Sequence, residues 1–131
     1  MNCLRDANDD EILFRHVQVA ESFWQRAVGL MGRTSLSVDE AFLIRPCRSI
    51  HTCFMRMAIT AAFCDKDGNV LKVASVVRPW RMRFGPKGTH FVIESATNSN
   101  RLEVGQRIQV CETDLSVRPN GEKSNPSPSD G

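Results

Sequence analysis

The chain has 131 residues, enough for one domain with a single core, and 41% of its residues are hydrophobic. Lys and Arg number 17 against 15 Asp and Glu, and this net charge of +2 argues against a dedicated nucleic-acid binder. No apolar run approaches the ~18 residues that a membrane span needs, and the acidic start MNCLRDANDDE carries no secretory signal. We therefore expect a cytoplasmic protein that makes no contact with membranes.

The cysteines are scattered along the chain without the framework of a disulfide-rich domain. In a chain with no visible export signal, an odd number of unpaired positions predicts reduced thiols. Most of them lie in or beside apolar, strand-like runs, where a free Cys packs as a small hydrophobic side chain. They are Cys3, Cys47, Cys53, Cys64 and Cys111.

The first third of the chain predicts a strand, a short helix and a second strand. Residues 1–10 are polar, and we expect a flexible N-terminus. Residues 11–20 (EILFRHVQVA) are rich in β-branched and aromatic residues and predict a strand. Ser22 opens an S-x-x-Q capping box, which predicts one short helix over residues 23–31. Residues 41–44 (AFLI) predict a short buried strand.

The centre of the chain, residues 50–77, predicts two strands joined by a tight turn. Asp, Gly and Asn fill the turn at residues 65–69, where the backbone must adopt positive φ. A period of two along the first strand predicts one bulky apolar face and one face of small or polar residues. The bulky positions are Met55, Met57, Ile59, Ala61 and Phe63, and the others are Arg56, Ala58, Thr60 and Ala62.

The last third predicts an irregular loop, two more strands and a tail. Pro and Gly punctuate residues 78–88, whereas residues 90–95 and 107–111 alternate like strands, with Ile108 and Val110 inward. From residue 113 onward the chain is polar and rich in Pro and Ser, which predicts a disordered tail. The whole pattern predicts a single β domain over residues 11–112. We expect a mainly β fold, an antiparallel sandwich or squat barrel (jelly-roll-like) with one short helix near the N-terminus.

Short motifs follow one another along residues 12–112: RAVGLMGR at 26–33, PCRSIHT at 46–52, MR at 55–56, Phe63, Asp65, Asp67-Gly68, Val70, PWR at 79–81, VIE at 92–94 and GQR at 105–107. Together they resemble an uncharacterised bacterial and archaeal family, the domain of unknown function 192. The resemblance implies a small, mainly β fold of jelly-roll-like or barrel-like character, and it implies no activity. Family members commonly read Pro-Ile-Asp where this chain has Ala58-Ile59-Thr60, so a charge usual in the family is missing at Thr60.

The stretch RPWRMRFGPK at residues 78–87 is the most suggestive candidate for binding, because it combines basic and aromatic residues. Trp80 and Arg81 could clamp an anionic or planar ligand by stacking and bidentate hydrogen bonds. Alternatively, Trp80 and Phe84 plug the open end of a barrel.

The small-residue face of the central strand offers a second possibility. If His51, Arg56, Arg81 and Glu94 meet over that face, they line a shallow pocket; the alternative is an exposed, hydrophilic sheet face. The candidate ligand-binding residues are therefore His51, Met55, Arg56, Trp80, Arg81 and Glu94.

We expect a non-catalytic binding or interaction module for a small polar or anionic ligand, with no cofactor. The alternative from another class is a hydrolase-like enzyme that uses His51, Cys53 and Glu94. A weaker alternative is single-stranded nucleic-acid binding through residues 78–87. The Cys and His spacing around residues 47–64 is not that of structural zinc, so we expect no metal. Sheet edges could support an oligomer.

Overall fold

The computed structural model describes residues 2–22, 30, 33–53 and 55–112. This part of the chain is mainly β, as predicted, and contains no helical element. The helix expected over residues 23–31 lies outside the described residues, except for Leu30, which is buried. The tail expected from residue 113 onward lies outside them as well.

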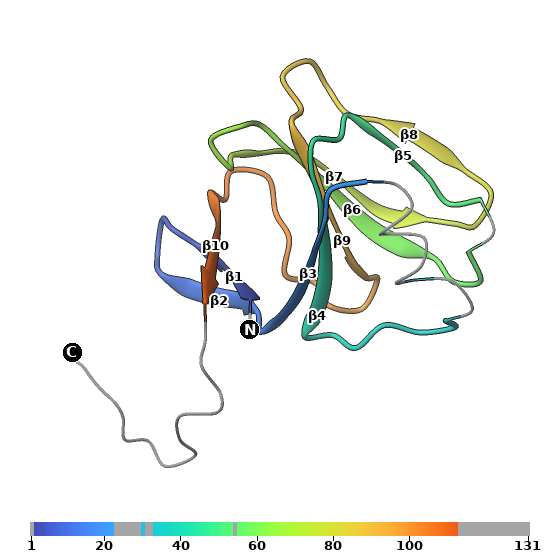
Figure 1. The fold of residues 1–131 in the computed structure, drawn as a ribbon, viewed down its shortest axis with the longest axis horizontal. Coiled ribbons are helices and arrows are strands. Elements are labelled where there is room, and N and C mark those ends of the chain that lie inside the picture. Colours follow the sequence, from blue (N-terminus) through green and yellow to red (C-terminus); the bar gives the residue numbers. More distant parts are fainter. Residues whose placement is uncertain (1, 23–29, 31–32, 54, 113–131) are drawn as a thin grey trace, which may run out of the picture.

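The strands form three sheets (Figure 1). The first is antiparallel and has the order β10-β1-β2, with β1 (Asn2–Asp6), β2 (Glu11–Phe14) and β10 (Ile108–Glu112). The second has the order β3-β4-β9-β6-β7, with β3 (His16–Ala20), β4 (Glu40–Ile44), β6 (Ile59–Cys64), β7 (Val70–Val77) and β9 (Phe91–Ala96). The third pairs β5 (Ser49–His51) with β8 (Met82–Phe84).

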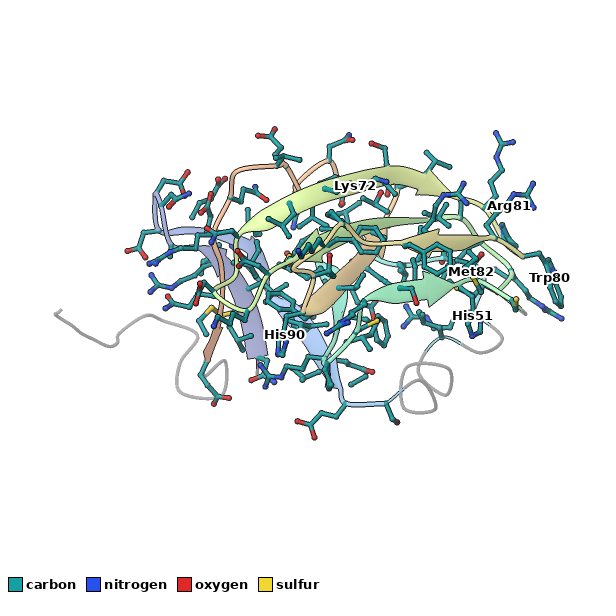
Figure 2. The ribbon with its side chains drawn as sticks, turned by 90° about the horizontal axis from the view of Figure 1, so that it is seen from above. His51, Lys72, Trp80, Arg81, Met82 and His90 are labelled. Carbon is teal, nitrogen blue, oxygen red and sulfur yellow. A yellow bond between two sulfur atoms is a disulfide. The ribbon has the colours of Figure 1, made fainter. Side chains whose placement is uncertain are left out.

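The five-stranded sheet lies between the two smaller sheets, with the three-stranded sheet at one end of the molecule and the β5–β8 pair at the other (Figure 1). Seen from above, Trp80, Arg81 and Met82 lie at the end remote from the three-stranded sheet (Figure 2). The sheets do not close on one another, so the predicted squat barrel is wrong. The jelly-roll-like sandwich stays a prediction.

The hairpin predicted at the centre of the chain is confirmed as β6 and β7, which pair antiparallel. At the turn, Oδ1 of Asp65 accepts hydrogen bonds from the backbone amides of Asp67 and Asn69, and Gly68 has φ of 95°. The first strand begins at Ile59, later than predicted, and residues 52, 53 and 55–58 lie outside the sheet.

The predicted apolar face of this hairpin packs into a core cluster on one side of the five-stranded sheet. Met57 is half-buried at the margin of the cluster, and Ile50 of β5 belongs to it. The bulky positions of the central strand are therefore inward, as predicted. The buried members are Leu30, Leu36, Phe42, Ile50, Met55, Ile59, Ala61, Phe63, Val77, Val92 and Ala96.

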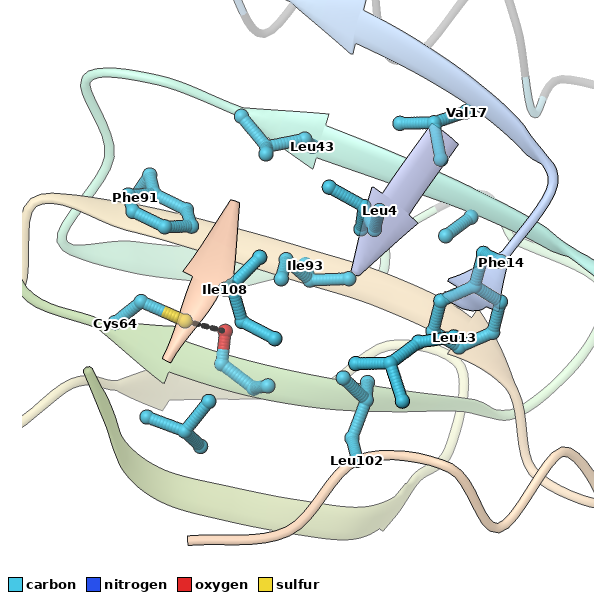
Figure 3. Packing of buried hydrophobic residues seen from close by; sticks show 13 residues of the cluster. Leu4, Leu13, Phe14, Val17, Leu43, Cys64, Phe91, Ile93, Leu102 and Ile108 are labelled. Atoms are coloured by element: carbon cyan, nitrogen blue, oxygen red, sulfur yellow. Dashed lines mark hydrogen bonds between the residues drawn. The ribbon is translucent and has the colours of Figure 1, made fainter. Parts of the chain in front are cut away.

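The opposite face of the same strand carries small residues, which we expected to form a pocket or a hydrophilic surface. Instead, Ala62 and Cys64 are fully buried in a second core cluster, which includes Leu4 and Phe14 of the three-stranded sheet and Ile93 of β9 (Figure 3). Small side chains let the two sheets approach closely. Both expectations for this face are therefore wrong over β6.

The N-terminal residues are ordered into a strand, whereas we expected a flexible segment. Residues 2–6 form β1, which pairs with both β2 and β10. The single strand expected over residues 11–20 is divided at Arg15, so that β2 belongs to one sheet and β3 to another.

Cys3 and Cys111 are directly opposite each other in the β1–β10 register and form a disulfide. The prediction of reduced thiols is therefore wrong for this pair, whereas Cys47, Cys53 and Cys64 keep their thiols. The cytoplasmic location stays a prediction, and the disulfide does not favour it, because disulfides are rare in cytosolic proteins. The described residues include no helix that is long and apolar enough to span a membrane.

The last strand also differs from expectation at one position. Ile108 is buried, as predicted, but Val110 is 36% exposed. Val110 lies opposite Leu4 in the register with β1, and β10 is an edge strand of its sheet. Ile108 of the same strand lies against the turn between β6 and β7, where its amide donates to the carbonyl of Gly68, whereas Val110 is two residues further along.

Candidate functional site

Residues 78–88, expected to be an irregular loop, contain a strand. β8 pairs antiparallel with β5, so that Ile50 is opposite Arg83 and His51 is opposite Met82. Three residues are too few to show a period of two in the sequence, and the middle residue of β8 is charged. We call these two strands the β5–β8 ribbon.

Thr52 fastens the loop before β8 to the end of β5. Its side chain is fully buried, and its hydroxyl donates to the carbonyl of Arg78 at 2.6 Å and accepts from the amide of Arg81 at 2.9 Å. The amide of Trp80 donates to the carbonyl of Thr52 at 3.0 Å. Trp80 has φ of 64°, a left-handed conformation that a bulky residue adopts only when its surroundings impose it. No local pattern around Thr52 indicates this anchoring role.

Three of the predicted site residues share the end of the molecule that this loop forms: His51, Trp80 and Arg81 (Figure 2). Trp80 is 59% exposed and Phe84 is 67% exposed. The two aromatic side chains therefore do not plug the interior, and that interpretation of residues 78–87 is wrong.

The other predicted site residues are placed differently. Glu94 is 0% exposed in the middle of β9, between β4 and β6, and Met55 is buried in the core. Arg56 is exposed. A carboxyl group that solvent does not reach cannot line a shallow surface pocket. The structure therefore does not contain the predicted pocket lined by His51, Arg56, Arg81 and Glu94.

Thr60, where family members commonly have an acidic residue, is used inside the sheet. Its hydroxyl donates to the carbonyl of Ser75 at 2.7 Å, at the point where the β6–β7 register shifts. The side chain is buried. In this chain the position therefore satisfies a backbone carbonyl at an irregularity of the hairpin.

A surface cleft of about 720 Å³ lies at the other end of β8, where three segments meet. One wall is the turn between β6 and β7, another is residues 85–90 between β8 and β9, and the third is Arg48 before β5. We call it the 85–90 cleft. Its lining residues are Arg48, Asp65, Lys66, Asp67, Gly85, Pro86, Lys87, Gly88, Thr89 and His90.

The basic groups of the 85–90 cleft are Arg48, Lys66, Lys87 and His90, and all four are exposed. One of the two acidic groups, Asp65, accepts hydrogen bonds within the hairpin turn. Desolvation opposes its ionisation, but hydrogen bonds from the Asn69 side chain and from the amides of Asn69, Asp67 and Gly68 outweigh this effect and lower the pKa of Asp65. Asp65 therefore stays ionised and, together with Asp67, offsets part of the positive charge that Arg48, Lys66 and Lys87 bring to the cleft.

Backbone hydrogen bonds hold the walls of the 85–90 cleft together. The amide of Gly85 donates to the carbonyl of Arg48 at 2.8 Å, and the amide of His90 donates to the carbonyl of Cys64 at 2.7 Å. At Gly85, a Cβ atom would lie 2.4 Å from Oγ1 of Thr89 and 2.8 Å from the ring of Phe63, so only glycine fits. The loop is thus preorganised against the hairpin.

A second cleft, of about 740 Å³, lies between the β2–β3 junction and residues 100–106. One of its two cations, Arg101, is paired with Asp39 at 2.8 Å, donates to the carbonyl of Leu13, and lies over the ring of Phe14 at 5.7 Å; the other is Arg15. Those contacts explain Arg101 as a structural residue. In the part of the chain that the structure describes, Arg48, Lys66 and Lys87 of the 85–90 cleft form no such ion pair with a carboxylate.

The free cysteines give little support to metal or nucleophilic chemistry. Burial, assisted by the nearby charge of Asp65, raises the pKa of the Cys64 thiol to about 12, and its Sγ lies 3.9 Å from the carbonyl of Ala62 (Figure 3). The thiol of Cys47 donates to the carbonyl of Ser49. Within the described ranges, no group of three or more His, Cys, Asp or Glu side chains is arranged to hold a metal ion.

The fold and the sequence together place the chain in a family. The model of the domain of unknown function 192, described as "Uncharacterized ACR", matches residues 5–110. The chain belongs to this family, as its motifs suggested. No curated protein matches the chain.

Two solved structures are similar to this one. The first is a protein of unknown function from Novosphingobium aromaticivorans DSM 12444, with a TM-score of 0.67 and 18% identity over 82% of each chain. The second, from Sinorhizobium meliloti 1021, is described as a "putative transcription regulator"; its TM-score is 0.67 at 17% identity, over 83% of this chain and 91% of the other. At these identities the likeness concerns the fold alone.

Proposed function

We propose that the chain is a non-catalytic binding module whose ligand is a small anion, held in the 85–90 cleft. The observation that carries the proposal is the convergence of Arg48, Lys66, Lys87 and His90 from three separate segments on one concave surface. The volume of about 720 Å³ lies within the ~300–1,000 Å³ of typical small-molecule sites.

The side chains of the cleft favour a ligand with phosphate or carboxylate groups. The Arg48 guanidinium presents a planar fork that can bind two oxygens of such a group, while Lys66 and Lys87 supply point charges. Asp65 and Asp67, which line the same cleft, disfavour a ligand that is negative over its whole surface. A small molecule with one anionic end and polar groups elsewhere fits this distribution best.

The rigid backbone of the cleft also supports a binding role. Gly85 and His90 are hydrogen-bonded to neighbouring segments, so the loop between them loses little further freedom when a ligand enters. The site differs from the one expected from the sequence, but the ligand class is the same. The hydrolase alternative requires Glu94 to act beside His51 and Cys53, and the enclosure of Glu94 within the sheet gives it no support.

Isothermal titration calorimetry with inorganic phosphate, and separately with glycerol 3-phosphate, at constant ionic strength tests the proposal. We expect saturable binding by the full chain. Arg48→Ala and Lys87→Ala should each weaken it about threefold to fivefold, because each removes one exposed charge contact worth up to about 1 kcal/mol. Lys72→Ala is the matched control, because Lys72 is exposed on β7 and does not line the cleft (Figure 2).

Equal weakening by Lys72→Ala would show that the anions respond only to the overall charge, and the proposal would then be wrong. Absence of saturable binding by either probe would contradict it as well.

A further inference from the structure

The outer face of the β5–β8 ribbon exposes three large apolar side chains in succession. Trp80, Met82 and Phe84 are 59%, 55% and 67% exposed. Met82 and Phe84 are two residues apart in β8 and so project from the same face. Trp80 lies two residues before Met82, and the two are close together at one end of the molecule (Figure 2). We call these three residues the apolar strip.

The inner face of the ribbon already has its partner. Ile50 of β5 is buried in the core cluster, and Arg83, its opposite in β8, is half-buried. The ribbon therefore uses one face to cover the core and presents the other to solvent. Trp, Phe, Met and Arg are the side chains most enriched in protein–protein interfaces, and a row of exposed apolar residues commonly marks one.

Charge is strongly segregated around the apolar strip. Residues 45–63 and 75–89, which form the ribbon and its flanks, contain no Asp or Glu. In contrast, the turn between β1 and β2 is acidic. A chain with a net charge of only +2 thus has a distinctly basic end. The basic residues of these two segments are Arg45, Arg48, His51, Arg56, Arg78, Arg81, Arg83 and Lys87; of these, Arg48 and Lys87 line the 85–90 cleft at the other end of β8 and are not part of the surface around the apolar strip.

Two of these arginines are folded onto the ribbon itself. Nη1 of Arg83 donates to the carbonyl of Met82 at 2.8 Å, and Nη1 of Arg81 lies 3.5 Å from the carbonyl of Trp80. Arg83 belongs to the inner face of the ribbon, whereas Arg81 is exposed beside Trp80, so the further donors of the Arg81 guanidinium lie at the margin of the apolar strip. Planar donors beside an apolar row match a peptide in which carboxylates alternate with apolar side chains.

We infer that the apolar strip docks an acidic, amphipathic segment of another protein, which is a function separate from anion binding in the 85–90 cleft. Trp80 is the anchor residue of this surface, and Arg81 at its margin selects for acidic partners. A symmetric contact with a second copy would bring two basic surfaces together, and repulsion between like charges opposes it.

Single-stranded nucleic acid would also meet basic and aromatic groups here, but two observations favour a peptide. Met82, between the two aromatic residues, offers no ring for base stacking. The overall charge of +2 provides no extended basic track beyond this end of the molecule.

Fluorescence anisotropy of the full chain against a set of ten-residue peptides tests the inference. In one half of the set Glu alternates with Phe or Leu, and in the other half Lys replaces Glu. We expect members of the acidic half to bind at least about tenfold more tightly than their basic counterparts, and Trp80→Ala to weaken that binding by at least about tenfold. Arg81→Glu should reduce the preference for acidic peptides.

Val104→Ala serves as the matched control, because Val104 is 64% exposed on a loop outside the ribbon. It should change the affinity less than about twofold. Lys87→Ala should weaken phosphate binding and leave peptide binding unchanged. Its effects therefore distinguish a failure of the anion-binding proposal from a failure of the peptide-docking inference. If the melting temperature shows that Trp80→Ala does not fold, Met82→Ser replaces it.

Three outcomes would overturn the inference. In the first, no acidic peptide binds in preference to its basic counterpart. In the second, a twelve-residue oligo-dT binds more tightly than any peptide and Trp80→Ala abolishes this binding, which would assign the surface to nucleic acid. In the third, light scattering shows a dimer that Trp80→Ala converts to monomer, which would assign it to a second copy of the chain.

Discussion

Gly68 shows how one residue connects two sheets. It has φ of 95° in the turn between β6 and β7, and its carbonyl accepts a hydrogen bond from the amide of Ile108 in β10 at 2.7 Å. A Cβ atom on Gly68 would lie 2.2 Å from the carbonyl oxygen of Ile108. The sequence predicted the positive φ from the composition of the turn, but the contact with β10 joins distant parts of the chain and has no local signal.

Gly68→Ala should lower the free energy of unfolding by at least about 2 kcal/mol. The left-handed conformation costs an alanine roughly 1–2 kcal/mol, and the collision with the β10 backbone adds to it. Urea denaturation measures the change. Gly105→Ala is the matched control, because Gly105 has φ of 99° with no atom within 4 Å of its Cβ position. Equal losses of unfolding free energy in the two variants would show that the contact with β10 does not contribute to stability.

At the level of the elements, the Cys3–Cys111 disulfide ties β1 to β10 over a separation of 108 residues. Both strands belong to the small sheet that covers the second core cluster. The two cysteines lie near opposite ends of the sequence, so no local spacing could reveal their pairing.

Replacing both cysteines by serine should lower the free energy of unfolding by about 2–5 kcal/mol, because the disulfide restricts the unfolded chain. Urea denaturation with and without dithiothreitol measures this loss, and the reductant should bring the natural chain to the stability of the double variant. Cys47→Ser is the control. Unchanged stability after reduction would contradict the prediction.

The start of β4 is held by an ion pair that is sensitive to acid. Arg33 donates two hydrogen bonds to the Glu40 carboxylate at 2.7 and 2.8 Å, and these bonds lower the pKa of Glu40 despite its partial desolvation. A lowered carboxyl pKa stabilises the folded chain above the ordinary pKa of about 4.3 and loses that effect as the pH falls through the folded value.

Glu40→Gln should therefore be less stable than the natural chain at pH 6, by an amount that shrinks as the pH falls from about 4.5 to 3. Melting temperatures measured across this range test the prediction. Parallel curves for the two proteins would show that the pair with Arg33 contributes nothing that depends on the ionisation of Glu40.

Over the whole molecule, local patterns predicted the elements whose side chains alternate over several residues. β6 and β7 followed from the alternation around Ile59 and Phe63 and from the turn between them, and β4 followed from the run AFLI. β1 was missed because its residues NCLRD are mostly polar and its order depends on β10, at the far end of the chain. β8 was missed because it has only three residues.

The candidate sites, too, could be predicted from the sequence only where the signal is local. Residues 78–87 were recognised as unusual from their composition, but the exposure of Trp80 and Phe84 depends on the pairing of β8 with β5 and on the buried hydroxyl of Thr52. The 85–90 cleft could not be predicted, because Arg48 and Lys66 come from segments that only the fold brings beside Lys87.

The most direct measurement of the central claim is a two-dimensional ¹H–¹⁵N NMR titration of the full chain with inorganic phosphate at constant ionic strength. If the 85–90 cleft holds a small anion, the largest saturable shifts will occur at the amides of Arg48, Lys66, Gly85 and residues 87–90. Shifts centred on His51, Trp80 and Arg81, or spread evenly over all basic surface residues, would contradict the claim.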